Sequence, residues 1–188
     1  MIVYFSRRGQ NLYRGPQPYL NVGNTELIAK AVVNRFPQPV LAEIVPVHPY
    51  PNDYQEALAV AKQELADRTL PAIKPLTADI AGSQHIILAF PKWWNHLPRP
   101  VVTFMKQFQW QNKTIYPVCT HEENRFGDIL NELAELAQGS TIERGLAIRG
   151  VCASDADRAV ENWLNNYDQD AAEQPLGMTA YWQTQPGK

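Results

Sequence analysis

The sequence predicts an α/β fold in which a parallel sheet is covered by helices on both faces. Five short apolar runs alternate with five stretches in which apolar residues recur at helical spacing. The two central runs, at 86–90 and 114–119, are nearly all apolar, which is typical of strands buried on both faces. Strands that alternate with helices pair in parallel through right-handed crossovers, so few topologies are left.

Five strands are expected along the chain. They lie at 2–5, 40–45, 86–90, 114–119 and 141–148. The third is expected to stop at Pro91, because proline has no N–H with which to continue a ladder of hydrogen bonds.

Five helices are expected between and after these strands, and sequence signals mark several of their ends. Asp53 and Glu56 have the spacing of a capping box, and Pro98 suits a first helical turn. The fourth helix ends near Gly139, and the fifth starts at Ser154. Their apolar faces, in order, are Leu27, Ile28, Ala31, Val32 and Phe36; Ala57, Leu58, Ala61 and Leu65; Val101, Val102, Met105 and Phe108; Ile129, Leu130, Leu133 and Leu136; and Ala156, Ala159, Val160, Trp163 and Leu164.

Composition indicates a globular chain with one domain. The 188 residues are 45% apolar and 19% charged, with a net charge of -2, which argues against nucleic acid as a partner. We expect the domain at 1–167 and a polar tail at 168–188, in which Tyr181 and Trp182 are candidates to pack back.

Several features bear on the cellular compartment. No apolar run approaches the roughly 18 residues of a membrane span, and no basic region precedes the first strand as in a signal peptide. The two cysteines form no metal or redox motif. We therefore expect a cytoplasmic protein that needs no membrane.

Trp93 and Trp94 follow the third strand directly. Large flat side chains beyond a strand end are costly to leave in water, so a stacked aromatic ligand is one interpretation. The alternative is that both rings cap the core beneath the loop. In an open parallel sheet, ligands bind beyond the carboxyl ends of the strands, where this loop is expected.

The loop after the first strand starts at Ser6 and reaches Gly23-Asn24-Thr25 at a helix start. Free N–H groups, the helix dipole and two hydroxyls favour an anion there. No lysine follows the glycine, so this is not a nucleoside-triphosphate P-loop. Asn24 could alternatively serve only as an N-cap.

The loop at 120–127 is dense in hydrogen-bonding groups and follows the fourth strand. Such a loop is a candidate for binding the polar edge of a ring. The alternative is a solvated turn that leads into the next helix.

Together these segments resemble the flavodoxin-like family, most closely its short bacterial branch, over nearly the whole chain to about Leu164. The matching segments are Ser6-Arg7 with Gly23-Asn24-Thr25-Glu26, Pro49-Tyr50-Pro51, Pro91-Lys92-Trp93-Trp94 with Leu97-Pro98-Arg99-Pro100-Val101, Thr120-His121-Glu122 with Phe126-Gly127, and Gly145-Leu146-Ala147-Ile148. The resemblance implies a doubly wound sheet of five parallel strands in the order 2-1-3-4-5.

The resemblance also implies an FMN site. Its phosphate and ribityl end would be held by Ser6, Asn11, Asn24 and Thr25. The isoalloxazine would be bordered by Pro91, Trp93 and Trp94 on one side and by Thr120, His121, Glu122, Phe126 and Gly127 on the other.

Two departures from the family pattern fall beside the ring. Glu123-Asn124-Arg125 stand where the family usually has Gly and Ser, and Asn95-His96 stand where Gly usually follows Trp-Trp. Because both lie beside the ring, the resemblance predicts the phosphate-binding residues more firmly than the residues that set the redox properties of the flavin.

His121 and Glu122 are the groups expected at the flavin's polar edge, with His121 as the candidate catalytic residue that supplies a proton. The alternative for His121 is a loop histidine bonded to the backbone. A metal site of His96, His121 and Glu122 lacks the spacing of known sites, so no metal is expected.

The resulting hypothesis is an FMN-binding redox protein, either an electron carrier or a small FMN-dependent oxidoreductase. The oxidoreductase would take electrons from NAD(P)H or a donor protein and pass them to a quinone or similar small acceptor. The carrier would shuttle single electrons between protein partners, and a net charge of -2 gives it little support. A flavodoxin fold that has lost its cofactor is the third alternative.

Overall fold

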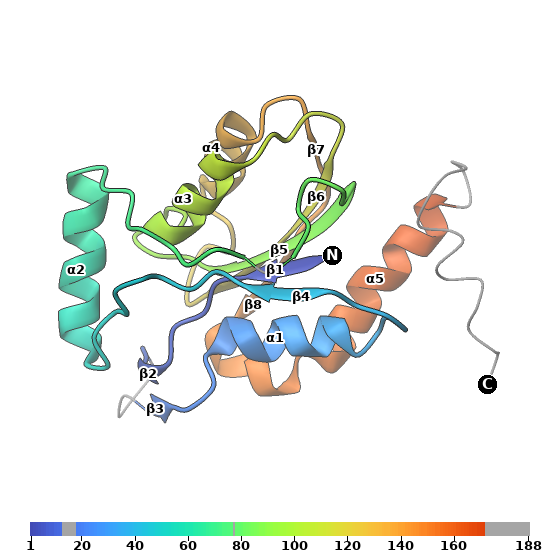
Figure 1. Cartoon of the computed structure of the whole chain (residues 1–188). Coiled ribbons are helices and arrows are strands. Elements are labelled where there is room, and N and C mark those ends of the chain that lie inside the picture. The colour runs from blue at the N-terminus through green and yellow to red at the C-terminus, as the bar shows by residue number, and fades with distance from the viewer. Residues whose placement is uncertain (13–17, 77, 172–188) are drawn as a thin grey trace.

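A parallel sheet forms the centre of the computed structural model, which describes residues 1–12, 18–76 and 78–171 (Figure 1). The sheet order is β4-β1-β5-β6-β7, and β8 also pairs with β6. These strands are β1 (Ile2–Tyr4), β4 (Leu41–Glu43), β5 (His85–Pro91), β6 (Thr114–His121), β7 (Thr141–Ile142) and β8 (Leu146–Arg149). The predicted order 2-1-3-4-5 is confirmed, with the fifth strand divided in two.

The division of the fifth strand lies opposite Pro117. β7 pairs with β6 at Ile115↔Ile142, whereas β8 pairs at Val118↔Leu146, so the fifth strand contains one extra residue between the two pairings. Residues of β6 face its two neighbours alternately, and Pro117 falls on the side of the fifth strand. Because Pro117 has no N–H to donate, the ladder is interrupted there.

Helices cover both faces of the sheet. Figure 1 shows α1 and α5 on one face and α3 and α4 on the other. The helices are α1 (Asn24–Val33), α2 (Tyr54–Ala66), α3 (Arg99–Gln107), α4 (Ile129–Leu136) and α5 (Asp157–Ala171), with the 3-10 helix η1 (Gly150–Asp155) before α5. Because helices cover both faces of the sheet, the central strands are buried on both sides, which explains why they are apolar.

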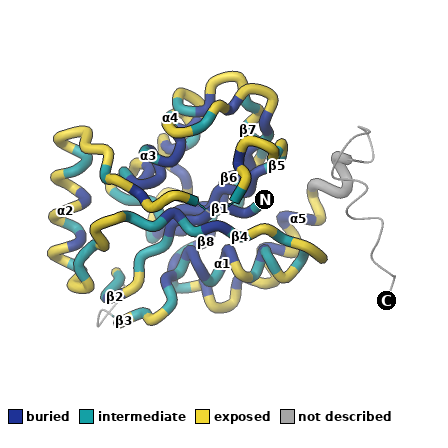
Figure 2. The backbone as a smooth tube through the Cα atoms, viewed as in Figure 1, coloured by how far each residue is buried: buried dark blue, intermediate teal, exposed yellow. Residues whose placement is uncertain are grey.

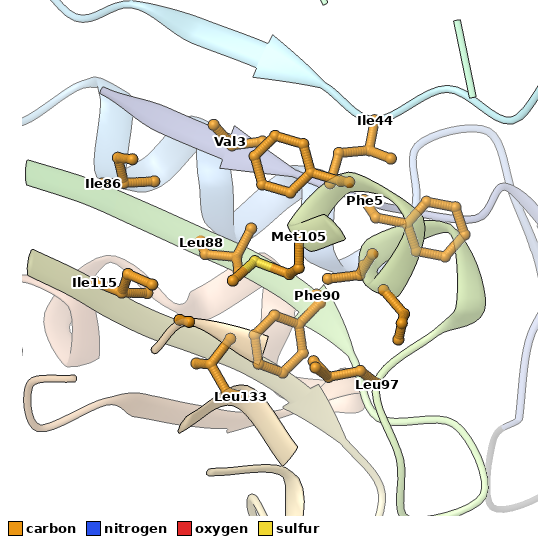
Figure 3. Packing of buried hydrophobic residues seen from close by; sticks show 14 of the residues in the cluster. Val3, Phe5, Ile44, Ile86, Leu88, Phe90, Leu97, Met105, Ile115 and Leu133 are labelled. Atoms are coloured by element: carbon orange, nitrogen blue, oxygen red, sulfur yellow. The ribbon is translucent and has the colours of Figure 1, made fainter. Parts of the chain in front are cut away.

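The core therefore has two parts, one on each face of the sheet. Figure 3 shows the first, in which strand residues such as Val3, Leu88 and Ile115 meet Met105 of α3 and Leu133 of α4. In the second, alternate strand residues pack against Ile28, Ala29 and Val32 of α1 and Val160, Trp163 and Leu164 of α5. The predicted helical faces thus pack in the core, except that of α2 and except Ala159 of α5, which is exposed.

α2 lies apart from both clusters and is mostly exposed (Figure 2). Its buried residues are Ala57 and Ala61. Asp53 caps it as predicted, since its side chain accepts a 2.9 Å hydrogen bond from the N–H of Glu56.

Several boundaries differ from the prediction. Pro98 is the N-cap of α3, and the fifth helix starts at Asp157 because Ser154 lies in η1. The first loop contains a short antiparallel pair that was not predicted, β2 (Gly9–Gln10) with β3 (Tyr19–Leu20).

The domain boundary predicted after residue 167 lies within α5, whose backbone continues to Ala171. Residues 172–188, including Tyr181 and Trp182, lie outside the described residues. None of the described helices is long and apolar enough to span a membrane.

Candidate functional site

A cleft of about 530 Å³ opens beyond the carboxyl ends of β1, β5 and β6. This is the place where ligands bind in open parallel sheets, since the strand order reverses there. All the predicted site residues line the cleft except Phe126 and Gly127; those that line it are Ser6, Asn11, Asn24, Thr25, Pro91, Trp93, Trp94, Thr120, His121 and Glu122.

The start of α1 forms one end of the cleft. Gly23 is the N-cap, so Asn24 is the first helical residue and the interpretation of Asn24 as an N-cap is wrong. Ser6 Oγ accepts a 3.1 Å hydrogen bond from the N–H of Glu26. A Cβ on Gly23 would lie 2.3 Å from Ser6 Oγ, so only glycine allows the first loop to approach the helix this closely.

Two buried hydroxyls lie beside this helix start. Thr25 Oγ1 and Thr120 Oγ1 are 2.7 Å apart, and the two residues are 2% and 4% exposed. One hydroxyl must donate to the other, so the second keeps a hydrogen for another acceptor. With the N–H groups of the first helical turn, this hydrogen gives the end of the cleft the character of an anion site.

Glu26 lies buried next to this anion end, and its charge is compensated. Lys30 Nζ lies 2.7 Å from one carboxylate oxygen and Arg8 Nη2 lies 3.3 Å from the other. Burial raises the pKa of Glu26, but the Lys30 ammonium and the Arg8 guanidinium outweigh it and hold this pKa below its usual range. The carboxylate therefore stays ionised and paired, and offers an incoming anion little net repulsion.

Arg7 is a lining residue that the sequence analysis did not single out. Its guanidinium donates to the carbonyl oxygens of Pro51, Asn52 and Asp53, at 2.9, 2.9 and 3.1 Å from Nη2, and also to Gln10 O. It thereby ties the first loop to the start of α2. The sequence shows only two consecutive arginines in a loop. This pattern does not distinguish an arginine that ties loops together from one that is exposed to solvent.

Trp93 and Trp94 lie in different environments. The Trp93 ring makes edge contacts with Phe5 and Tyr50, at centroid distances of 5.3 and 4.9 Å. Trp94 is 41% exposed, donates from Nε1 to Leu58 O at 3.3 Å, and lies 5.2 Å below Lys62 Nζ. Trp93 thus packs against the core and also lines the cleft, and Trp94 forms the rim.

The turn that carries Trp94 has an unusual backbone. Trp94 and Asn95 have φ values of 51° and 67°, and Trp93 and His96 exchange two backbone hydrogen bonds across them. Two central residues with positive φ are the mark of a type I′ turn. Asparagine tolerates this conformation, but a tryptophan there stores strain of about 1 kcal/mol or more at the rim of the cleft.

α2 supplies a wall that the sequence analysis placed in the core. Tyr54, Ala57, Leu58 and Ala61 all line the cleft. The small side chains of Ala57 and Ala61 are one turn apart, so they leave room for a flat ligand beside the helix. The available signal in the sequence was weak: two of the four apolar residues on the predicted face of this helix are alanines.

His121 is the last residue of β6 and is 9% exposed. Its Nδ1 is buried and has no hydrogen-bond partner among the described residues. The interpretation as a loop histidine bonded to the backbone is therefore wrong. Burial lowers the pKa of His121, and Lys92, Arg125 and Arg149 lower it further, so the imidazole is uncharged at neutral pH.

Glu122 and Asn24 meet over Gly150 at the floor of the cleft. A Cβ on Gly150 would lie 2.5 Å from Glu122 Oε1 and 2.6 Å from Asn24 Nδ2. Lys92 closes the neighbouring side, since its ammonium donates to Asn95 Oδ1 at 3.0 Å and also to Glu123 O. It joins the loops that follow β5 and β6.

Phe126 and Gly127 lie away from the cleft. Phe126 is buried in the core and presses on Gly145, where a Cβ would lie 2.4 Å from its ring. Gly127 has a φ of 54° and lies against the Asn95 side chain. Asn124 and Arg125 also have positive φ, so the loop at 122–127 turns sharply. It does so although Glu123-Asn124-Arg125 are bulkier than the Gly and Ser usual in the family.

No group of three or more histidine, cysteine, aspartate or glutamate side chains could hold a metal ion within the described part of the chain. His96, one of the three residues considered for such a site, instead lies 3.5 Å from Glu132.

Comparison with known proteins agrees with this geometry. A family model described as flavodoxin matches residues 19–167. The chain belongs to the flavodoxin family. The arrangement of a polar anion end and an apolar wall agrees with the FMN site that the resemblance to flavodoxins implies.

Solved structures share the flavodoxin fold. A proposed flavoprotein from Bacteroides uniformis is 23% identical with a TM-score of 0.68, covering 88% of this chain and 96% of that one. A flavoprotein from Lactobacillus acidophilus, solved in complex with FMN, is 18% identical with a TM-score of 0.59, covering 86% of this chain and 95% of that one. Curated proteins give no match.

Proposed function

We propose that this chain is an FMN-dependent redox protein that holds the cofactor in the cleft beyond β1, β5 and β6. The observation that carries the proposal is the buried hydroxyl pair of Thr25 and Thr120 at the start of α1, opposite an apolar wall. A cleft with an anion end and an apolar end suits a molecule that has a phosphate at one end and a flat ring at the other. The FMN complex of the Lactobacillus acidophilus flavoprotein supports this choice of ligand.

The residues present fit the two ends of FMN. Ser6, Asn24 and Thr25 would hold the phosphate through hydroxyl, amide and N–H donors. Trp94 and Leu58 would cover the ring from the side of α2, and His121 and Glu122 would face its polar edge. When bound, FMN supplies the exchange of one or two electrons, while the protein sets the binding and the electrostatics.

The chain's own part in the chemistry centres on His121. Because this imidazole is uncharged at neutral pH, it offers a neutral N–H to a ligand instead of a positive charge. As the candidate catalytic residue, His121 would therefore donate a hydrogen bond from this N–H to the ring's polar edge. To supply a proton it would first have to take one up, which negative charge on its partner would favour.

Within this class, we propose an oxidoreductase with a small acceptor such as a quinone, with NAD(P)H or a donor protein as the source of electrons. The fixed charges of the lining residues are balanced, since Arg7 and Lys92 oppose Glu122 and Glu123. A carrier steered to a protein partner by electrostatics needs a face of one sign, which the described residues of this cleft do not supply. The carrier stays the second candidate function.

Replacing Thr25 with alanine tests the cofactor and its orientation. The lost hydroxyl serves the phosphate, so FMN should bind about 10-fold more weakly or worse, while riboflavin, which has no phosphate, is little changed. Ser6→Ala should act in the same direction. Quenching of flavin fluorescence on titration with protein measures both affinities.

A hydroxyl outside the cleft gives the control. Thr103 Oγ1 bonds to Pro71 O at 2.9 Å, so Thr103→Ala should leave both affinities unchanged. Equal weakening of FMN and riboflavin in Thr25→Ala would show that the phosphate end is placed wrongly. No binding of either flavin by the unmodified chain would leave a flavodoxin fold without a cofactor.

Reduction under nitrogen separates the two candidate functions. An oxidoreductase should lose its flavin absorbance with NADH or NADPH alone and regain it when a benzoquinone is added. A carrier would need a chemical reductant or a donor protein and would be reduced in two resolved one-electron steps. The second pattern would overturn the oxidoreductase assignment and keep the cofactor.

A further inference from the structure

Three basic side chains meet at the ends of three adjacent strands. Pro91 of β5 pairs with Thr120 of β6, and His121 of β6 pairs with Arg149 of β8. The N–H of Lys92 still bonds to Thr120 O at 2.8 Å, so Lys92 extends the register by one residue and falls beside His121. Lys92, His121 and Arg149 therefore form one row across the strand ends, with His121 in the middle.

The row lies on the face of the sheet that α3 and α4 cover. Two residues before each member, Phe90, Cys119 and Ala147 all pack in the core on that face. Because side chains alternate along a strand, Lys92, His121 and Arg149 point to the same side. Within the described residues none of Lys92, Arg125 and Arg149 has a carboxylate within salt-bridge distance. These cations therefore act on the imidazole with little compensation.

His121 and Arg149, which are partners in the strand register, carry side-chain atoms with complementary hydrogen-bonding chemistry. Within the described residues, His121 Nδ1 and Arg149 Nε are the buried side-chain polar atoms that have no partner. The Arg149 Nε carries a hydrogen at every accessible pH, and an uncharged imidazole has one nitrogen that can only accept. Leaving two buried polar atoms unpaired is unfavourable. The structure shows no direct bond between them, but one bridging water would satisfy both by accepting from Nε–H and donating to Nδ1.

We propose that Arg149 is a positioning residue for His121: through one bridging water, the buried Nε–H of Arg149 makes Nδ1 of His121 an acceptor, so that Nε2–H is the hydrogen that His121 presents to the cleft. The identity of the ligand at Nε2 rests on the proposed function, but the arrangement within the protein does not. A charged imidazole would have a hydrogen on both nitrogens and would face Lys92, Arg125 and Arg149 at once. The cationic row thus disfavours that state, consistent with the lowered pKa of His121.

The carboxylates near the row do not reverse this electrostatic balance. Glu122 follows His121 directly but reaches over Gly150 toward Asn24, and Glu123 is exposed. Lys92 is held on the other side by Asn95 Oδ1 and Glu123 O, which are neutral acceptors. The charges that act on His121 are those of Lys92, Arg125 and Arg149.

The test is the protonation state of His121 in the full chain, read by ¹⁵N and ¹³C NMR of labelled histidine without FMN. The chain has four histidines, and the loss of one set of signals in His121→Gln assigns this residue. The unmodified chain should show the Nε2–H form above the pKa of His121. In Arg149→Met this pKa should rise by about one pH unit, and the two neutral forms should mix.

Two further variants separate charge from hydrogen bonding. Arg149→Lys keeps the positive charge but moves the donor, so the pKa should stay low while the Nε2–H form is no longer fixed. Lys106→Met removes one charge in the last turn of α3 and should change neither property. A His121 that carries its hydrogen on Nδ1, or an Arg149→Met variant with unchanged pKa and tautomer, would overturn the proposal.

These spectra also separate this proposal from the proposed function. Adding FMN should shift the Nε2 resonance of His121, because Nε2–H is the group offered to the ligand. A chain that shows the predicted tautomer but binds no FMN would overturn the cofactor assignment and leave the role of Arg149 supported. A chain that binds FMN while the two neutral forms of His121 mix would support the cofactor assignment and overturn the role of Arg149.

Discussion

At the residue scale, adjacent residues in this chain have separate tasks. Trp93 completes an edge-to-face cluster with Phe5 and Tyr50, whereas Trp94 lies on the surface of α2 with Lys62 above its ring. The two rings separate because Trp94 has a positive φ, so the chain turns directly after Trp93. One tryptophan therefore contributes mainly to stability and the other to the rim of the cleft.

We predict that alanine substitutions at the two positions have opposite profiles. Trp93→Ala should lower the free energy of unfolding by about 2–4 kcal/mol, because it removes a packed ring. Trp94→Ala should lower it by less than about 1 kcal/mol but change the absorbance spectrum of bound flavin. Urea denaturation and flavin difference spectra measure the two effects. An unchanged spectrum with Trp94→Ala would place the flavin ring elsewhere.

At the scale of elements, the cleft depends on close contacts between loops that follow different strands. Gly150, the first residue of η1, supports the side chains of Asn24 from α1 and Glu122 from the end of β6. Arg7 links the first loop to the start of α2, and Lys92 links the loops after β5 and β6. Each link joins segments far apart in the sequence, so the cleft depends on the sheet that brings these segments together.

We predict that Gly150→Ala weakens FMN binding by several-fold with little loss of stability. The added methyl would displace Glu122 Oε1 and Asn24 Nδ2, both flexible side-chain ends. Gly82→Ala is the matched control, because its methyl would meet Asp79 Oδ2 at 2.4 Å, outside the cleft. Thermal unfolding should change equally in the two variants while flavin titration separates them. Equal FMN affinity would mean that Asn24 and Glu122 take no part in binding.

At the scale of the whole molecule, burial makes folding depend on pH. Burial lowers the pKa of His85 and, with nearby cations, that of His121 below the ordinary value of 6.5. As pH falls, these two histidines take up protons in the unfolded chain before they do so in the folded chain. Their contribution to the free energy of unfolding is therefore complete above pH 6.5 and is lost as the pH falls toward the folded pKa values. Glu26, whose pKa lies below 4.5, adds a further loss at lower pH. Glu64, whose pKa is raised by burial, acts in the opposite sense.

We predict that the urea midpoint of the unmodified chain falls between about pH 7 and pH 5 and that His121→Gln makes this fall smaller, since glutamine does not titrate there. His48→Gln is a control at an exposed histidine and should leave the slope unchanged. A steeper slope in His121→Gln would contradict the sign of the shift at His121.

The sequence by itself determined the fold class, the strand order through its resemblance to flavodoxins, and about half of the residues that line the cleft. Hydrophobic periodicity and the capping signal at Asp53 act locally, so they can be read along the chain. Ser6, Thr25, Thr120 and His121 were found because each follows a strand or starts a helix, and parallel strands bring such positions to one edge.

Only the tertiary structure decided which side chains face the cleft and how they are paired. Phe126 lies in the core, and the alanines of α2 form a wall of the cleft. Trp93 packs against Phe5, whereas Trp94 lies under Lys62. The row of Lys92, His121 and Arg149 depends on the register between three strands, and the break at Pro117 sets part of that register. Register is a property of pairs of strands, so the pattern along any one strand does not contain it.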